Sequence, residues 1–268
     1  MNTLEEVLRA GFETLNLPLT DEMLVRYRRY YDALDEKNKV MNLTAITGET
    51  DVAQLHFLDC AALLSLTEMR GKTLWDIGTG AGFPGLALKI ACPELNLTLL
   101  DSLDKRIAFL QETCHTLGFD DVACLHARAE EAAPAHRESA DIVTARAVAG
   151  LNILAELCLP FVREGGLFLA MKGPDFEEEL EQAKPSIKAL GGKTEKCVLY
   201  TVPGTEIRHS ALMIRKIGKT PEKYPPQMGS DKKEPIIEYS APVHRQWKQS
   251  FRPLQRGALP RCENPRQH

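Results

Sequence analysis

The chain has 268 residues, of which 44% are hydrophobic, 26% charged and 6% aromatic. This composition excludes a disordered or fibrous protein and is typical of one globular domain, with or without attached segments. No run approaches the ~18 uninterrupted apolar residues of a transmembrane helix, and the N-terminus lacks the basic start and apolar core of a signal peptide. We therefore expect a cytoplasmic protein with no membrane contact.

The net charge of −4 conceals an uneven distribution along the chain. Residues 1–214 hold 21 Lys and Arg against 32 Asp and Glu, a balance of −11, whereas residues 215–268 hold 12 against 5, a balance of +7. A basic tail on an acidic body is associated with nucleic-acid contact, but such a tail also keeps a protein soluble. Charge alone does not separate these two interpretations.

The cysteines are odd in number and scattered, without a Cys-x-x-Cys pair. We predict buried thiols in a reducing compartment, and no spacing among them indicates a metal site. The seven are Cys60, Cys92, Cys114, Cys124, Cys158, Cys197 and Cys262.

The first part of the chain, residues 1–70, is predicted to be helical. Apolar side chains recur at spacings of three and four in a first segment after Leu4 and in a second segment after Thr20. A third helix is expected from Thr50 through Leu63. The apolar positions of the first two segments are Leu4, Val7, Leu8, Phe12 and Leu15, then Leu24, Tyr27, Tyr31 and Leu34.

From Thr73 to Lys216, short apolar runs alternate with helical segments, which is typical of a parallel sheet with helices on both faces. The last two runs have no helix between them, and this predicts an antiparallel hairpin at one edge. Strands are expected at residues 73–78, 96–101, 122–127, 141–147, 167–172, 197–202 and 210–216, and helices at 83–91, 104–117, 150–158 and 176–190. The chain thus divides into a helical region (1–70), an α/β domain (71–216) and a basic Pro- and Lys-rich arm with a tail (217–268).

A glycine-rich loop joins the first strand to the next helix in the sequence DIGTGAGFPG, residues 76–85. Gly78, Gly80 and Gly82 allow a tight turn and a close approach to a ligand. A dinucleotide fingerprint would need glycine where Phe83 stands, and no Gly-Lys-Ser/Thr follows to make a phosphate-binding Walker loop. The loop is therefore predicted to bind a nucleotide-like ligand without a pyrophosphate.

Asp101 ends the second strand, about 20 positions after the loop. An acid at this place suits hydrogen bonds to ribose hydroxyls. Taken alone, Asp101 could equally cap the helix that follows, and the glycines could form only a tight turn. Their order and spacing together favour a nucleoside site.

The pattern Asp/Glu-x-Gly-x-Gly-x-Gly, with an acid on the next strand, resembles the class I methyltransferases that bind S-adenosylmethionine. That cofactor has a ribose and an adenine but no phosphate. The resemblance implies a Rossmann-like, mostly parallel seven-stranded sheet with an antiparallel edge hairpin, and this agrees with the predicted elements.

Seven segments, in order, narrow the resemblance. They closely resemble the bacterial 16S rRNA (guanine-N7) methyltransferase family, once called glucose-inhibited division protein B, over about residues 1–236. The resemblance implies methylation of guanine N7 at position 527 of 16S rRNA, with 16S rRNA or the small ribosomal subunit as partner. We also expect a monomer, although nothing in the sequence fixes the oligomeric state. The segments are MNLTAI (41–46), HFLDCAALL (56–64), DIGTGAGFPG (76–85), LDSLDKRIAFL (100–110), ARAEE (127–131), DIVTARAVA (141–149) and GGLFLAMKG (165–173).

The same resemblance implies a set of cofactor-binding residues at the carboxyl ends of the strands. Taken alone, Glu130 would be a surface acid and Arg146 a member of a surface ion pair. The implied residues are Gly78, Gly80, Gly82 and Phe83 in the loop, Asp101 at the ribose, Ala129 and Glu130 by the adenine, and Arg146 at the reaction face.

Substrate-side candidates lie on the same rim, where basic side chains could hold phosphates or read the guanine acceptors. In the helical region, Asn42 could instead be a turn residue, and His56 with Asp59 a helical i,i+3 pair. The candidates are Asn42, His56, Asp59, Lys105, Arg106, Arg128 and Lys172.

Guanine N7 carries a lone pair and no proton, so its methylation is a direct displacement that needs no general base. We assign no catalytic residue and no metal ligand. Residues 144–147 read TARA, without the Pro-Pro of amino-group methyltransferases, and Cys158 lacks the setting of a cytosine C5 nucleophile. A methyltransferase for another RNA base or a small molecule, and an inactive cofactor-binding RNA module, remain as alternatives.

The C-terminus departs from the family. Members resemble one another in a final K-x-T-P-x-x-Y-P-R stretch, whereas here Tyr224-Pro225 is followed by Pro226. Residues 237–268 have no counterpart in the family. Three interpretations remain open for them: an additional RNA-binding tail, an extension specific to this lineage, or an artefactual read-through.

Overall fold

The computed structural model describes residues 3–146 and 149–225. The predicted tail 237–268 and Cys262 lie outside the described residues. Of the six described cysteines, four are buried as predicted, whereas Cys124 and Cys197 are partly exposed. No helix in the described part combines the length and the apolar character needed to cross a membrane.

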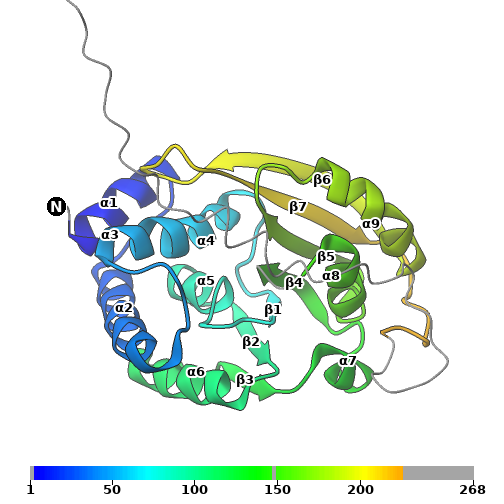
Figure 1. Cartoon of the computed structure of the whole chain (residues 1–268), viewed down its shortest axis with the longest axis horizontal. Helices are drawn as coiled ribbons and strands as arrows, with labels where there is room; N and C mark the ends of the chain where they lie inside the picture. Colours follow the sequence, from blue (N-terminus) through cyan, green and yellow to red (C-terminus); the bar gives the residue numbers. More distant parts are fainter. Residues whose placement is uncertain (1–2, 147–148, 226–268) are drawn as a thin grey trace, which may run out of the picture.

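The described residues form a sheet of seven strands in the order β3-β2-β1-β4-β5-β7-β6 (Figure 1). All neighbouring strands are parallel except β7, which is antiparallel to both β5 and β6. The mostly parallel sheet, the antiparallel edge hairpin and the helical N-terminal part predicted from the sequence are confirmed. The strands are β1 (Thr73–Ile77), β2 (Asn96–Asp101), β3 (Ala123–His126), β4 (Ala140–Arg146), β5 (Val162–Lys172), β6 (Gly192–Thr201) and β7 (Arg208–Lys216).

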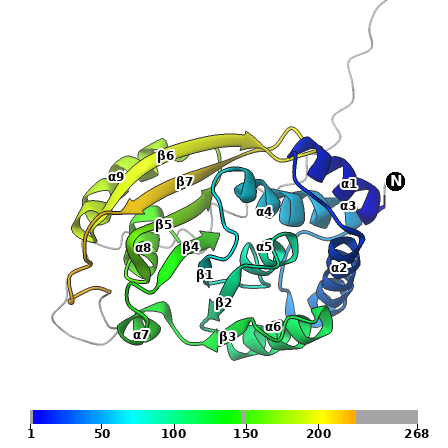
Figure 2. The same cartoon turned by 180° about the vertical axis from the view of Figure 1, so that it is seen from behind.

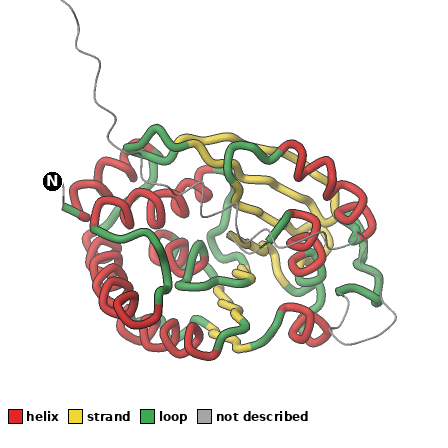
Figure 3. Tube along the Cα trace, in the orientation of Figure 1, coloured by secondary structure: helices red, strands yellow, loops and turns green. Residues whose placement is uncertain are grey.

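Helices precede the sheet and connect its strands (Figures 1 and 3). The helix expected over residues 50–63 is instead four short consecutive segments, one of them a π-helix. The helices are α1 (Leu4–Thr14), α2 (Asp21–Met41), α3 (Glu49–Val52), the π-helix η1 (Ala53–Leu58), α4 (Asp59–Ala61), the 3-10 helix η2 (Ala62–Ser65), α5 (Gly85–Ala91), α6 (Asp104–Leu117), α7 (Ala129–Ala132), the 3-10 helix η3 (Ala133–Ala135), α8 (Leu151–Cys158) and α9 (Glu177–Ala189).

Two strands begin five residues earlier than predicted, β5 at Val162 and β6 at Gly192. Their first five residues, Val-Arg-Glu-Gly-Gly and Gly-Lys-Thr-Glu-Lys, contain few apolar side chains, which hides the strand pattern in the sequence. Cross-strand contacts stabilise these ends instead, as in the ion pair between Arg215 and Glu195.

Side chains alternate between the two faces of the sheet and build two hydrophobic cores. On β5, Leu167 and Leu169 join the core beneath α1, α2, α5 and α6, whereas Phe168 and Ala170 join the core beneath α7, α8 and α9. Figure 2 shows the sheet and its helices from behind. The N-terminal helices therefore share a core with the sheet.

Helix α2 attaches to the region of the glycine loop through two buried tyrosines. The Tyr27 hydroxyl donates to the Ala87 carbonyl at 2.9 Å, and the Tyr30 hydroxyl donates to the Ala81 carbonyl at 2.6 Å. The apolar stripe had been expected to pass through Tyr31, but Tyr30 is fully buried and Tyr31 only partly. This face of α2 lies inward because the Ala81 carbonyl of the glycine loop and the Ala87 carbonyl of α5 accept the phenolic hydrogen bonds.

Glu49 joins the three N-terminal helices at one point. Its carboxylate accepts two hydrogen bonds from Arg28, at 2.7 and 2.9 Å, and a third from the Leu4 backbone at 2.9 Å. These bonds lower the pKa of Glu49 to about 2. A lowered pKa means that the carboxylate stabilises the fold above its unfolded pKa and loses this effect as the pH falls through about 2.

We expect Glu49→Gln to lower the free energy of unfolding near pH 7 by about 1 kcal/mol, because over a third of each partner's side chain is exposed and the pair is screened. The difference from the wild type should shrink as the pH falls from about 4.5 toward 2. Urea denaturation at several pH values measures it. Glu5→Gln, which breaks an exposed pair with Arg9, is the control, and a difference that does not depend on pH would contradict the assignment.

Candidate functional site

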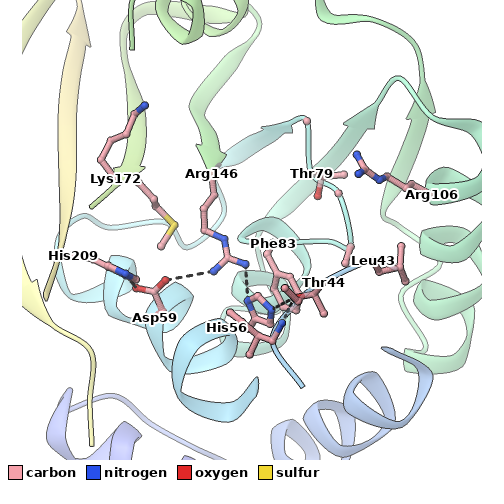
Figure 4. A pocket seen from close by; sticks show the side chains of 16 residues that line it. Leu43, Thr44, His56, Asp59, Thr79, Phe83, Arg106, Arg146, Lys172 and His209 are labelled. Atoms are coloured by element: carbon pink, nitrogen blue, oxygen red, sulfur yellow. Dashed lines mark hydrogen bonds and ion pairs between the residues drawn. The ribbon is translucent and has the colours of Figure 1, made fainter. Parts of the chain in front are cut away.

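A cavity of about 280 Å³ opens at the carboxyl ends of β1, β4 and β5 (Figure 4). Its walls are residues 43–46 after α2, the side chains of His56 and Asp59, the glycine loop, and residues at the ends of β4 and β5 and the start of β7. Ligands of open parallel sheets bind at this edge, and the volume is near the lower end of the ~300–1,000 Å³ typical of small-molecule sites.

Eight of the residues that the sequence predicted for the site line this cavity, and seven do not. The lining residues are Gly78, Gly80, Phe83, Arg146, His56, Asp59, Arg106 and Lys172. Those outside the lining are Gly82, Asp101, Ala129, Glu130, Asn42, Lys105 and Arg128.

Asp76 fixes the shape of the glycine loop from beneath. Its carboxylate accepts hydrogen bonds from the Thr79 hydroxyl at 2.6 Å and from the Gly85 amide at 2.8 Å, so both ends of the loop attach to one side chain. Burial raises the pKa of Asp76 to about 6, against the lowering effect of these bonds. The helix α5 consequently starts at Gly85, two residues later than predicted, because Phe83 and Pro84 belong to the loop.

Gly82 serves the packing of the loop against α2. A Cβ at this position would lie 2.5 Å from the Tyr30 hydroxyl oxygen and 3.0 Å from a methyl carbon of Leu110, and φ is +104°. A Cβ on Gly80, in contrast, would meet nothing within 4 Å. Gly80 therefore leaves space on the side of the cavity, whereas Gly82 permits the Tyr30 contact.

Asp101 lies directly behind the loop and is 2% exposed. Its carboxylate accepts the Gly80 amide at 2.9 Å and the Leu103 amide at 3.0 Å, and it pairs with Arg106 at 3.2 Å. Arg106 itself lines the cavity. Asp101 thus has a role at the entry of α6, which was one of its two sequence-based interpretations, and it also holds the glycine loop through Gly80.

Arg146 ends β4 and lies between Asp59 and His56, as Figure 4 shows. Its guanidinium donates to the His56 Nδ1 atom at 2.7 Å, to the Leu55 carbonyl at 3.2 Å and to the Asp59 carboxylate at 3.4 Å. The carbon Cζ is also 5.0 Å from the centre of the Phe83 ring. Arg146 is therefore part of an internal network, in place of the surface pair considered from the sequence.

His56 is held as a neutral ring. Burial lowers its pKa well below the usual range, and the neighbouring Arg146 cation lowers it further. Because Nδ1 accepts from Arg146, Nε2 carries the hydrogen and donates to the Thr44 hydroxyl at 2.9 Å. The ring also stacks on Phe83 with centroids 4.2 Å apart. Both ring nitrogens are thus engaged.

Three polar residues of the hydrogen-bond network around His56, Arg146 and Asp59 escaped the sequence analysis: Thr44, Tyr200 and His209. Thr44 lies within the quoted segment 41–46, and Asn38 holds its backbone by two hydrogen bonds of 2.9 Å. Tyr200 and His209 face each other across the β6–β7 hairpin and both reach Asp59. No local sequence pattern predicts Tyr200 and His209 as site residues, because only the fold brings them into contact with Asp59.

Several predicted residues instead have local roles. Asn42 ends α2 with φ of +49°, which is the turn role considered for it. Arg128 pairs with Glu130 at 3.7 Å at the start of α7, and Lys105 is exposed on α6. Lys172 lines the cavity, but its ammonium donates to the Ala149 carbonyl and to Glu179, both at 2.8 Å.

Sequence comparisons match one family over most of the chain. A family model described as GidB, rRNA small subunit methyltransferase G, matches residues 23–208. The chain is 45% identical to the ribosomal RNA small subunit methyltransferase G of Pelotomaculum thermopropionicum, over 88% of this chain and 100% of the relative. It is 46% identical to the protein of the same name from Alkaliphilus metalliredigens, over 86% and 98%. A solved structure of M. jannaschii TYW2 in complex with AdoMet aligns with a TM-score of 0.49 and 13% identity, over 62% of this chain and 81% of that one.

We expect Gly82→Ala to lower the free energy of unfolding by about 2 kcal/mol more than Gly71→Ala, because both glycines have positive φ but only Gly82 faces a close contact. In a Tyr30→Phe background the extra cost should fall, since the nearest clashing atom is absent. Urea denaturation of the single and double variants measures both effects. Strictly additive losses would show that Tyr30 does not require glycine at this position.

Proposed function

The chain belongs to the rRNA small subunit methyltransferase G family and is a methyltransferase that uses S-adenosylmethionine, and we propose that it methylates N7 of a guanine in 16S rRNA. By resemblance, the target is position 527. The family match over residues 23–208 carries this proposal. We further propose that the enzyme acts in the cytoplasm as a monomer, on 16S rRNA or the small ribosomal subunit.

The glycine-loop side of the cavity supports the proposed cofactor site. The open space at Gly80 leaves room for a ligand against the loop backbone. Arg106 is paired with Asp101, so its charge is already offset by a carboxylate. This agrees with a ligand that has a ribose and an adenine but no phosphate for the arginine to bind. The Ala127 amide donates to the Asp101 carbonyl at 3.2 Å, which brings the start of α7, with Ala129 and Glu130, beside Asp101. We propose that these residues bind the nucleoside half of S-adenosylmethionine.

The other side of the cavity supports a target that needs no proton acceptor. Both nitrogens of His56 are engaged, and Asp59 accepts hydrogen bonds from three side chains. Guanine N7 attacks through a lone pair and has no proton to lose, so positioning of the base against the methyl donor is the main requirement. When bound, the cofactor supplies the methyl group. We propose that Lys105, which is exposed on α6, offers positive charge to the RNA backbone, whereas Arg128 is paired with Glu130.

The direct test incubates the purified protein with labelled S-adenosylmethionine and small ribosomal subunits or naked 16S rRNA from a strain that lacks the modification. We expect label in 7-methylguanosine, and digestion to nucleosides with mass spectrometry identifies it. Label in another nucleoside would replace the guanine-N7 assignment. Cofactor binding without any transfer would favour an inactive RNA-binding module.

Asp101→Asn should weaken S-adenosylmethionine binding by about 10-fold or more, because the amide cannot hold Gly80, Leu103 and Arg106 as the carboxylate does. Isothermal titration calorimetry gives the dissociation constant. Asp141→Asn is the matched control, since Asp141 pairs with Arg163 at the opposite end of β4. Equal losses in the two variants would contradict a cofactor role for Asp101.

A further inference from the structure

Asp59 is the meeting point of three separate parts of the chain. One carboxylate oxygen accepts the Tyr200 hydroxyl from β6 at 2.8 Å and His209 Nδ1 from β7 at 2.8 Å. The other oxygen faces the Arg146 guanidinium at 3.4 Å. Asp59 is 1% exposed, so these bonds form away from water, where they are strongest.

The backbone around Asp59 explains how one side chain reaches all three partners. The π-helix η1 ends immediately before Asp59, and such segments often occur at functional sites. The hairpin attaches to the same helix, because the Gln54 side chain donates to the Gly204 carbonyl at 3.0 Å. Tyr200 and His209 are directly opposite in the β6–β7 register, so their side chains extend from the same face of the hairpin.

The charges of the cavity follow one rule among the described residues: each lining Lys or Arg is paired with a carboxylate. Arg106 pairs with Asp101, Lys172 with Glu179, and Arg146 with Asp59. Arg146 is the more buried of the two arginines, with 12% of its side chain exposed against 36% for Arg106. Since His56 is neutral, Asp59 offsets the charge at the centre of the network.

We propose that Asp59 is a positioning residue that orients Arg146 and offsets its charge, so that the cavity accepts a cationic ligand. This inference rests on the proposed function, because S-adenosylmethionine carries a sulfonium cation and methylation at N7 leaves the positive charge on the guanine. Without the carboxylate, the buried guanidinium would repel both cations across a site of low dielectric. Tyr200 and His209 act on Arg146 only through Asp59, because they hydrogen-bond to the Asp59 oxygen that does not face Arg146.

The experiment compares the affinities of two ligands that differ in charge at sulfur. Titration calorimetry of wild type and Asp59→Asn with S-adenosylmethionine and with S-adenosylhomocysteine gives two dissociation constants for each protein. In Asp59→Asn we expect the cationic ligand to bind at least ~10-fold more weakly and the neutral ligand to change less than ~3-fold. General damage to the fold would weaken both equally, and that result would overturn the proposal.

A double variant tests whether Asp59 acts through Arg146. In an Arg146→Met background the uncompensated charge is absent, so adding Asp59→Asn should leave the ratio of the two affinities within ~3-fold. A ratio that shifts as much as in the wild-type background would overturn the proposal. Glu195→Gln is the matched control, because it removes a carboxylate from the same hairpin at an exposed pair.

If Asp59→Asn does not fold, Tyr200→Phe tests the proposal instead, because it removes one hydrogen bond to Asp59 and keeps the negative charge of the carboxylate. We expect a ~3–10-fold lower kcat on ribosomal subunits with an unchanged KM and an unchanged affinity ratio. An unchanged kcat would overturn the positioning role. The two proposals fail separately. If the wild type forms no 7-methylguanosine, the proposed function fails, but the ratio of the two affinities still tests the role of Asp59. If the wild type forms 7-methylguanosine and the ratio is the same in Asp59→Asn, only the inference about Asp59 fails.

Discussion

The close approach of α2 to the glycine loop is the constraint on which the rest of the site depends. The Tyr30 hydroxyl donates to the Ala81 carbonyl, and only glycine fits at position 82 beside it. On the other side, Asp76 holds the loop at Thr79 and Gly85. The loop is thus fixed from both sides by buried polar contacts, which satisfy groups that would otherwise be costly to bury.

The same approach turns the N-terminal helices into a wall of the cavity. Since these helices share a core with the sheet, the segment after α2 and the π-helix meet the end of β4. Thr44, His56 and Asp59 come from this wall, and Arg146 joins it to the sheet. The antiparallel hairpin completes the site through Tyr200 and His209, so a strand pair at the sheet edge contributes to the centre.

Periodicity predicted most elements, and it failed mainly where contacts between distant segments decide the structure. Tyr30 and Tyr31 are adjacent on a helix, and the contact with the glycine loop, which lies about 50 positions later, decides which is buried. The starts of β5 and β6 were missed because their polar residues are stabilised by cross-strand partners that no single segment reveals. Asn42 and Arg128 were in segments typical of the family, but each has a local role at a helix end.

By itself, the sequence determined the order of elements, the mostly parallel sheet, and the nucleoside type of ligand, because the glycine spacing and the acid at the end of the second strand are local properties of the chain. Only the tertiary structure decided which charges remain free. The −4 of the whole chain, and even the cluster of basic residues at the strand ends, did not reveal that Arg106, Arg146 and Lys172 are each paired with a carboxylate. For Arg146, the partner is 87 positions away in the chain, and pairing over such separations depends on the fold alone.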